Sequence, residues 1–331
     1  MTNCLYGIWG SGSGAAWAVG DSGTILELSG TTWTRSSSPT ANYLYGVWGS
    51  SATNVWAVGD ASTLLHWTGT AWAAVSSGYS GYLSAVRGSG MYVWAVGEAW
   101  TVLERAGGTW AKVVGGLNSD LYAVSGTSTT DVWAFGGEFG STGVVQHWNG
   151  TGWTSSSVPA SALALYGVSA GSPTAAWAVG SGGTIVRWNG TAWAKVTSGT
   201  SNDLNAVWGS SPTDVWAVGN AGTILHWNGS AWTRFASNTS AYLLGVWGSA
   251  STDVWAVGQA GTALHWNGTA WSAATSATSS DLYGVWGSAS KDVWAVGAAG
   301  TIVHWTGAWT AVTSPFSNDL YGVGGIGASS V

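Results

Sequence analysis

The sequence has little cysteine, little charge and no long apolar run. Cys4 is the only cysteine among 331 residues, which excludes a disulfide framework and a cysteine-based metal site. Only 7% of the residues are charged and the net charge is −6, so no basic stripe is available for phosphates, and we expect no nucleic-acid partner. The apolar runs are short and interrupted by Gly, Ser and Thr, so we expect no insertion into a membrane.

Tryptophan is what the chain has in abundance. There are 28 of them in a composition that is 46% hydrophobic, which supplies enough apolar area to bury and argues against disorder. The N-terminal stretch MTNCLYG shows neither the basic segment nor the apolar run of a signal peptide.

The tryptophans belong to an internal repeat. The motif WAVG, once written WAFG, recurs at intervals of 38 to 44 residues, with its tryptophan at Trp17, Trp56, Trp94, Trp133, Trp177, Trp216, Trp255 and Trp294. A period in this range is typical of stacked or radially arranged units. Because the repeat runs from end to end without a linker, we predict one domain over residues 1–331.

Each repeat predicts four short strands. In residues 204–235 the segments LNAVWG, DVWAVG, TILHWN and SAWTRF are rich in β-branched and aromatic residues and are separated by turn residues. An Asn-Gly pair, as at Asn228-Gly229, joins the third and fourth segments and predicts a type I′ hairpin turn. In Val215–Val218 both alternating sets are apolar, which predicts a sheet that is covered on both sides.

We therefore predict an all-β fold, an eight-bladed β-propeller of four-stranded antiparallel blades with a period of about 39 residues. The first strand occurs nine times, from LYGIWG at Leu5 to LYGVGG at residues 320–325. Three arrangements are open for the ninth copy. One terminal copy displaces the other in blade one, the array is part of a longer one, or the ends exchange between molecules.

The segments VWAVG, GTILHW and NGTAW on this period resemble the repeats of tectonin-type propeller lectins and, more distantly, the propellers of photosystem assembly factors. The resemblance covers the whole chain. It implies a blade with LYGVWG innermost and AWT outermost, and glycan binding at the blade edges, in some cases of methylated glycans. The Asp-box pattern of sialidase propellers is absent, since the corresponding turn reads NGTAW.

The polar residues are periodic, which argues against a single catalytic centre. All five histidines occupy one column of the repeat, and copies on neighbouring blades are too far apart to share a metal ion. We expect them to be bonded at blade interfaces, or else to contact a ligand. Two aspartate columns are expected to cap turns through their own backbone: Asp131, Asp214, Asp253 and Asp292, and Asp120, Asp203, Asp281 and Asp319. No blade carries a singular carboxylate pair or a nucleophile elbow, so we predict no enzyme, metal or cofactor.

The tryptophans carry the functional hypothesis. Four of them meet at one end of each blade, where they form either inter-blade core or platforms for sugar rings. The candidate ligand-binding residues, taken from blades two, six, seven and eight, are Trp48, Trp56, His66, Trp67, Trp208, Trp216, His226, Trp227, Trp247, Trp255, His265, Trp266, Trp286, Trp294, His304 and Trp305.

Low charge together with abundant Ser, Thr, Asn and Trp favours a neutral polar ligand. We predict a multivalent lectin of bacterial secreted type, extracellular or on the cell surface, whose partners are neutral, possibly methylated, glycans or glycoconjugates on cell surfaces. The alternative is a non-catalytic structural or protein-interaction propeller in a surface assembly, in which a homo-oligomer is possible. An enzyme with its site in the axial channel is a third, weaker hypothesis.

Overall fold

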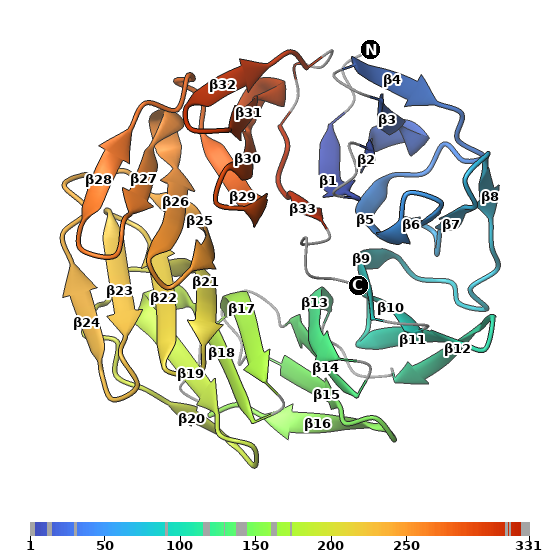
Figure 1. The fold of residues 1–331 in the computed structure, drawn as a ribbon. Coiled ribbons are helices and arrows are strands. Elements are labelled where there is room, and N and C mark those ends of the chain that lie inside the picture. Colours follow the sequence, from blue (N-terminus) through green and yellow to red (C-terminus); the bar gives the residue numbers. More distant parts are fainter. Residues whose placement is uncertain are drawn as a thin grey trace.

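The computed structural model describes residues 4–11, 15–29, 32–89, 92–114, 120–128, 130–136, 144–159, 164–172, 174–314, 317 and 319–325. Within these ranges the strands form eight sheets that are arranged in a ring (Figure 1). Each sheet, or blade, contains the four consecutive strands of one sequence repeat, and these strands pair antiparallel. The structure confirms the predicted eight-bladed propeller with four-stranded blades.

The strands of the first four blades follow the chain order. They are β1 (Leu5–Gly10), β2 (Ala15–Gly20), β3 (Ile25–Ser29), β4 (Thr32–Ser36), β5 (Leu44–Ser51), β6 (Asn54–Gly59), β7 (Leu64–Trp67), β8 (Trp72–Ala74), β9 (Leu83–Ser89), β10 (Tyr92–Gly97), β11 (Thr101–Ala106), β12 (Thr109–Val114), β13 (Leu121–Ser128), β14 (Asp131–Gly136), β15 (Val144–Trp148) and β16 (Trp153–Ser157).

The strands of blades five to eight continue the same order. They are β17 (Leu165–Ser172), β18 (Ala175–Gly180), β19 (Thr184–Trp188), β20 (Trp193–Lys195), β21 (Leu204–Ser211), β22 (Asp214–Gly219), β23 (Thr223–Trp227), β24 (Trp232–Phe235), β25 (Leu243–Ala250), β26 (Asp253–Gly258), β27 (Ala263–Trp266), β28 (Trp271–Ala274), β29 (Leu282–Ala289), β30 (Asp292–Gly297), β31 (Ile302–Trp305) and β32 (Trp309–Val312).

The first strand of each blade lies innermost and the fourth lies outermost (Figure 1). Neighbouring first strands contact one another, as β25 does β29, which agrees with the order that the resemblance implies. The second strand is covered on both sides: Trp216 is 1% exposed, and Ala217 and Val218 are fully buried. Two-sided burial explains why this strand is a continuous apolar run.

The glycine that ends each WAVG strand is required by a close backbone approach. A Cβ at Gly219 or Gly258 would collide with the carbonyl of the residue that precedes the first strand of the same blade. Next to this contact the first strand bulges, so that Leu282 and Tyr283 together face Gly297 of the second strand. A bulge redirects a side chain, and here the redirected residue is the tyrosine of the LYG motif.

The connections between the third and fourth strands differ from the prediction. In a type I′ turn both central residues have positive φ, but at Asn228-Gly229 only the glycine does, with φ of +96°. The Asn228 carboxamide oxygen instead accepts hydrogen bonds from the backbone N–H groups of Ser230 and Ala231. The loop is therefore an Asx-type turn of four residues between paired Trp227 and Trp232.

Short 3-10 turns join the second and third strands in four blades. They are η1 (Asp21–Gly23), η2 (Ser181–Gly183), η3 (Gln259–Gly261) and η4 (Ala298–Gly300). In η2, η3 and η4 the backbone N–H of the middle residue points toward the next blade, which matters for the aspartates described below.

The ninth copy of the first strand lies between blades eight and one, where its last two residues form β33 (Gly324–Gly325). β33 pairs parallel with β1, so blade one becomes a five-stranded sheet with both copies in place (Figure 1). The ninth copy also packs on blade eight: a Cβ at Gly284 would meet Tyr321 and Val323, as one at Gly245 meets Tyr283 of the next blade. We call this junction the seam.

Candidate functional site

The histidines of blades two, four, six, seven and eight are bonded within their own blade, whereas we expected bonds at blade interfaces, and contact with a ligand stays a prediction. His226 Nε2 lies 2.5 Å from Asp214 Oδ1, and the same pairing has a distance of 2.6 Å at His265–Asp253 and 2.7 Å at His304–Asp292. The equivalent pair in blade four, His147 and Asp131, is separated by 2.8 Å.

Each of these histidines also stacks on the WAVG tryptophan of its own blade, with ring centroids 3.7–4.3 Å apart. In blade two the partner is a neutral amide, since His66 Nε2 lies 2.7 Å from Asn54 Oδ1. Burial, followed by the nearby Arg105, lowers the pKa of His66. The side chains of His226, His265 and His304 keep 21–28% of their area exposed, so they reach the surface.

A serine completes the cluster in blades six, seven and eight. Ser210, Ser249 and Ser288 donate to the other carboxylate oxygen of the same aspartates. Burial alone would raise the pKa of Asp292, but hydrogen bonds from Ser288, His304 and Trp294 outweigh it and lower that pKa. In each of these blades the aspartate lies between serine and histidine, whereas a nucleophilic triad needs the serine bonded to the histidine. The cluster therefore does not have the connectivity of a nucleophilic triad.

The second aspartate column corrects the expectation of capping through its own backbone. Asp281 Oδ1 accepts a 2.8 Å hydrogen bond from the N–H of Ala260, which lies in the turn of the preceding blade. Asp203 does the same with Gly182, and Asp120 with Ala99. These aspartates join neighbouring blades.

The predicted tryptophan sites divide by exposure. Seven are at most 9% exposed: Trp48, Trp56, Trp67, Trp216, Trp227, Trp255 and Trp266. Five are half-buried: Trp208, Trp247, Trp286, Trp294 and Trp305. Many indole rings pack across blade junctions, as Trp216 does against Trp266 and Trp271. Ligand binding at these residues stays a prediction.

The indole N–H groups have two environments. Trp67 and Trp266 donate to backbone carbonyls of Ala52 and Ser251 at 3.2 Å. The buried N–H groups of Trp216 and Trp255 have no hydrogen-bond partner among the described residues. Packing, more than hydrogen bonding, holds these second-strand rings.

Two further features of the described residues bear on the site. No group of three or more His, Cys, Asp or Glu side chains within them is placed to hold a metal ion. Nor does any helix in that part of the chain have the length and hydropathy of a membrane span.

At the opposite end of the strands, the structure brings together residues that the sequence analysis did not select. Five tyrosines, which we call the tyrosine arc, follow one another around the inner edge: Tyr283, Tyr321, Tyr6, Tyr45 and Tyr82. Successive ring centroids are 5.1, 6.4, 5.4 and 6.3 Å apart. Tyr321 is 52% exposed. Four of the five belong to the recurring LYG motif, whose tyrosine is polar enough to face water, and Tyr82 directly precedes the first strand of blade three.

Carboxylates surround the tyrosine arc. The Tyr82 hydroxyl donates to Asp120 at 2.6 Å, and those of Tyr283 and Tyr321 donate to Asp319 at 3.3 and 3.4 Å. Burial, followed by the charge of Asp319, raises the pKa of Tyr283 to about 12. The pKa of Tyr82 is raised as well, by burial and by its hydrogen bond to Asp120. The hydroxyls are therefore neutral donors at physiological pH.

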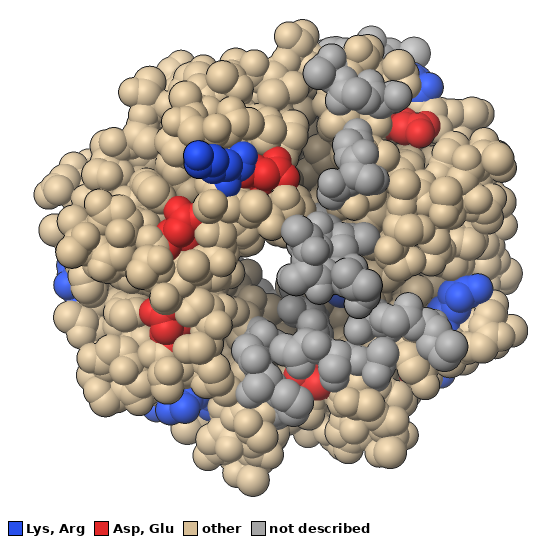
Figure 2. Space-filling view, in the orientation of Figure 1, with Lys and Arg blue, Asp and Glu red and all other residues tan. Residues whose placement is uncertain are grey.

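The charged residues in the loops at this end are all acidic, and the nearest cations, Arg35 and Lys112, lie on the outermost strands. The connections between second and third strands and the segments before first strands contain Asp21, Asp60, Glu98, Asp120, Asp203, Asp281 and Asp319. No Lys or Arg occurs in these segments in any repeat. Figure 2 shows one face of the ring, on which both Lys or Arg and Asp or Glu form small separated patches around an axial opening. A uniformly acidic rim attracts cations, whereas scattered charges do not converge on a ligand.

Comparison with known proteins identifies the fold. No protein-family model matches the sequence, and no curated protein does. Among solved structures, YCF48 bound to a D1 peptide has a TM-score of 0.59 at 17% identity, over 80% of this chain and 93% of that one. The computationally designed Ika8 protein has a TM-score of 0.75 at 15% identity, over 92% and 97%. The C-terminal WD40 domain of Sif2 has a TM-score of 0.65 at 10% identity, over 94% and 95%.

These neighbours are similar to this chain in fold alone. They agree with the more distant of the two resemblances noted in the sequence, that to the propellers of photosystem assembly factors. The resemblance to tectonin-type lectins stays a prediction.

Proposed function

We propose that this chain is a non-catalytic interaction propeller that binds an extended, basic segment of a partner protein at the tyrosine arc. The observation that carries the proposal is the continuous run of five tyrosine rings beside loops whose charged residues are all acidic. Tyrosine faces attract Lys and Arg side chains within about 6 Å of the ring centroid, and carboxylates pair with the same groups.

The comparisons support the class of partner. YCF48, a propeller of similar fold, has been solved with a bound D1 peptide, so a propeller of this shape is able to hold a peptide. WD40 domains such as that of Sif2 share the fold at similar coverage. Carrying peptide binding to this chain is part of the proposal, as is the absence of catalysis.

Fluorescence anisotropy with labelled peptides tests the proposal. A peptide of alternating Arg and Leu should bind, its affinity should fall with added salt, and a Glu/Leu peptide of equal length should not bind. The double variant Tyr283→Ala with Tyr321→Ala should weaken binding at least tenfold. Tyr166→Ala is the matched control, because Tyr166 is 41% exposed and lies outside the tyrosine arc. Equal binding of both peptides, or an unchanged double variant, would refute the proposal.

Carbohydrate binding is a second candidate, favoured by a different observation. Trp208, Trp247 and Trp286 are half-buried first-strand residues in consecutive blades, at the end of the strands where the His–Asp pairs lie. Partly exposed indole rings beside polar groups suit the C–H face of a neutral sugar. An extracellular or cell-surface location, with glycans as partners, belongs to this candidate.

A glycan array that includes methylated sugars tests the lectin candidate. Binding that Trp247→Ala abolishes, while the Tyr283→Ala, Tyr321→Ala variant keeps it, would favour the lectin over the peptide-binding propeller. An array without any bound glycan would remove this candidate.

A further inference from the structure

Aromatic rings fill the junctions between blades four and eight, whereas between blades two and three Arg105 takes the place of one ring and lies 5.0 Å from the centroid of Trp56. In the four junctions from blade four to blade eight, the WAVG tryptophan of one blade contacts two tryptophans of the next, with ring centroids 4.7–5.4 Å apart. One of the two comes from the end of the third strand and the other from the start of the fourth. Trp255, for example, contacts Trp305 at 4.7 Å and Trp309 at 5.1 Å and is fully buried.

The seam lacks this filling. The WAVG tryptophan of blade eight is Trp294, and the third-strand residue facing it from blade one is Leu28 in place of tryptophan. The fourth-strand Trp33 is present, but no ring contact joins it to Trp294 within the described residues. As a result Trp294 is half-buried, whereas the other seven WAVG tryptophans are at most 2% exposed.

The first strands at the seam lack a second aromatic contact. At the junctions of blades six with seven and of blades seven with eight, the first-strand tryptophan fits against a glycine of the next blade: the ring of Trp208 lies 2.6 Å from where a Cβ on Gly248 would be, and Trp247 lies as close to Gly287. The corresponding Gly10 of blade one meets no indole, and its nearest neighbour would be Ala16 at 3.8 Å. The ninth copy adds no ring either, because its residue at the tryptophan position is Gly324.

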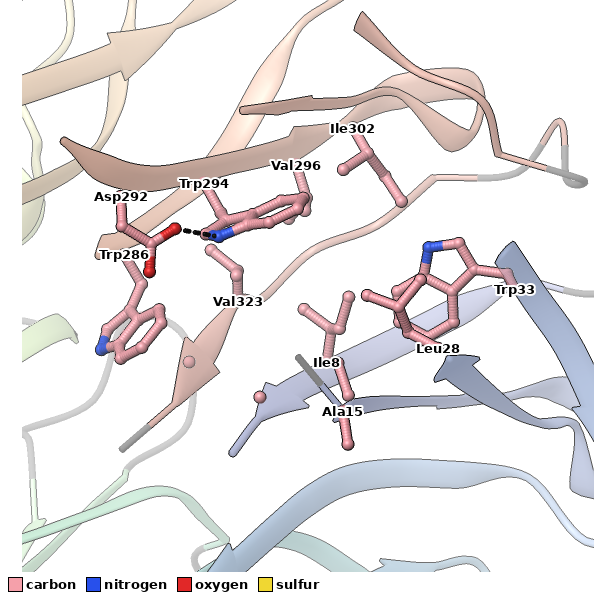
Figure 3. Close-up of a pocket in the computed structure, with 13 residues that line it drawn as sticks. Ile8, Ala15, Leu28, Trp33, Trp286, Asp292, Trp294, Val296, Ile302 and Val323 are labelled. Carbon is pink, nitrogen blue, oxygen red and sulfur yellow. Dashed lines mark hydrogen bonds between the residues drawn. The ribbon is translucent and has the colours of Figure 1, made fainter. Parts of the chain in front are cut away.

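An apolar cavity of about 210 Å³ results at the seam. Figure 3 shows Trp286 and Trp294 on the wall from blade eight, and Ile8, Leu28 and Trp33 on the wall from blade one. Val323 enters between them from the ninth copy (Figure 3). The carboxylate of Asp292 is the one charged group of the lining, and it accepts a 2.9 Å hydrogen bond from the Trp294 indole.

We propose that the seam cavity is a binding site for a small, uncharged, planar aromatic molecule of about the size of indole. Other repeats show which group fits, because they have a tryptophan at the positions that Leu28 and Gly324 occupy at the seam. The volume agrees, because an engineered apolar cavity of about 150 Å³ in another protein holds benzene, and this one leaves room for a fused second ring. An N–H on the bound ring would face Asp292.

The proposal is independent of the tyrosine arc, which lies at the other end of the strands. It makes this propeller asymmetric in function, because the seam takes a ligand where the junctions from blade four to blade eight use their own indole rings. We expect indole to bind more tightly than benzene because it fills more of the cavity volume. We also expect it to bind more tightly than indole-3-acetate, whose negative charge would approach Asp292.

Methyl-labelled isoleucines provide a direct test in the intact protein. Indole added to the wild type should shift the NMR signals of Ile8 and Ile302, which line the cavity, in a saturable way. The signals of Ile185 and Ile224, buried at ordinary junctions, should not move. Unmoved signals at Ile8 and Ile302 would overturn the proposal. Shifts of these two signals that grow with protein concentration alone would assign the cavity to a second copy of the chain, which also overturns it.

Two variants sharpen the test. Leu28→Trp supplies the missing ring and should weaken indole binding at least tenfold. Trp227→Leu turns the junction of blades five and six into a seam-like one, and indole should then also shift Ile185, the counterpart of Ile302. Unchanged binding in Leu28→Trp, or no response of Ile185 in folded Trp227→Leu, would contradict the inference that a missing indole creates the site.

Discussion

The junction of blades seven and eight and the seam are built from nearly the same sequence, but they pack differently. In the first, Trp255 is enclosed by Trp305 and Trp309; in the second, Trp294 faces Leu28 and a separate Trp33. The difference comes from a few letters in blade one and in the ninth first-strand copy. The repeated sequence determines the circular arrangement of the blades. Individual departures from the repeat determine which junction contains a cavity.

The comparison also separates two contributions to stability. In a repeat protein each unit is stabilised by its neighbours, so the free energy of unfolding can be divided into contributions from the individual junctions. The blades at the two junctions have the same pattern of backbone hydrogen bonds. The two junctions differ in how much aromatic area they bury. Mutations that act through packing should therefore distinguish the two junctions.

The largest expected effect is on aromatic packing. Trp255→Ala should lower the free energy of unfolding by about 3–5 kcal/mol, because it removes a fully buried ring and leaves a cavity. Trp294→Ala should cost clearly less, since its ring is half-buried and faces the seam cavity. Urea denaturation of both variants measures the difference. Equal losses would show that the seam is as tightly packed as the other junction.

Filling the seam should have the opposite sign. Leu28→Trp places a ring beside Trp294 and should raise the free energy of unfolding by about 0.5–2 kcal/mol, as other cavity-filling changes do. Val303→Trp, on the enclosed side of blade eight, is the control and should destabilise because it overpacks a fully buried position. A Leu28→Trp protein that is less stable than wild type would mean that the cavity does not accept a ring.

A smaller effect is expected for the aspartates that bridge blades. Asp281→Ala and Asp319→Ala each remove the acceptor of one backbone N–H, that of Ala260 or Ala299, which should cost about 1 kcal/mol. Asp319→Ala also removes the acceptor of the Tyr283 and Tyr321 hydroxyls, so its cost should be the larger of the two. Only Asp319→Ala should release the ninth copy from blade eight, since Leu320 follows Asp319 directly and bonds to Gly297. Limited proteolysis followed by mass spectrometry should therefore detect faster cleavage near residue 320 in that variant alone.

The smallest effect compares two histidine pairs. Burial lowers the pKa of His66 below its value in the unfolded chain, so its contribution to stability is complete above pH 6.5 and is lost as pH falls through the folded pKa. Asn54→Asp would give His66 the carboxylate partner of the other blades and should remove this loss. The measurement is the free energy of unfolding at pH 7 and pH 5. The reciprocal variant Asp214→Asn should lose more stability between pH 7 and pH 5 than the wild type does. No difference between wild type and Asn54→Asp would contradict the assignment.

The fold was predictable because several independent signals agree: the period, the strand composition and the two-sided burial of segments such as Val215–Val218. The hairpin turn was predicted less well. Asn-Gly indicates a type I′ turn when the loop has two residues, but Asn228 uses its side chain to organise a loop of four. The loop length depends on where strand pairing ends, which cannot be read from the sequence alone.

The candidate site was predictable only in part. That His226 lies beside Trp227 in sequence does not reveal that it stacks on Trp216 of the adjacent strand, because stacking depends on strand register. The tyrosine arc was missed because it is assembled from five first-strand regions, one of them the ninth copy, and only ring closure brings Tyr321 against Tyr6. The seam cavity was also missed, since it depends on which two repeats meet last.

The parallel pairing of β33 with β1 has a mechanical consequence. Leu320 lies beside Leu5, and Gly324 beside Trp9, so the two strands run in the same direction from one end of the ring to the other. Tension that pulls Leu5 one way and Gly325 the other would slide the strands past each other and strain all of their bridges at once. A ring closed in this manner resists stretching by its ends better than one whose last strands peel apart bond by bond.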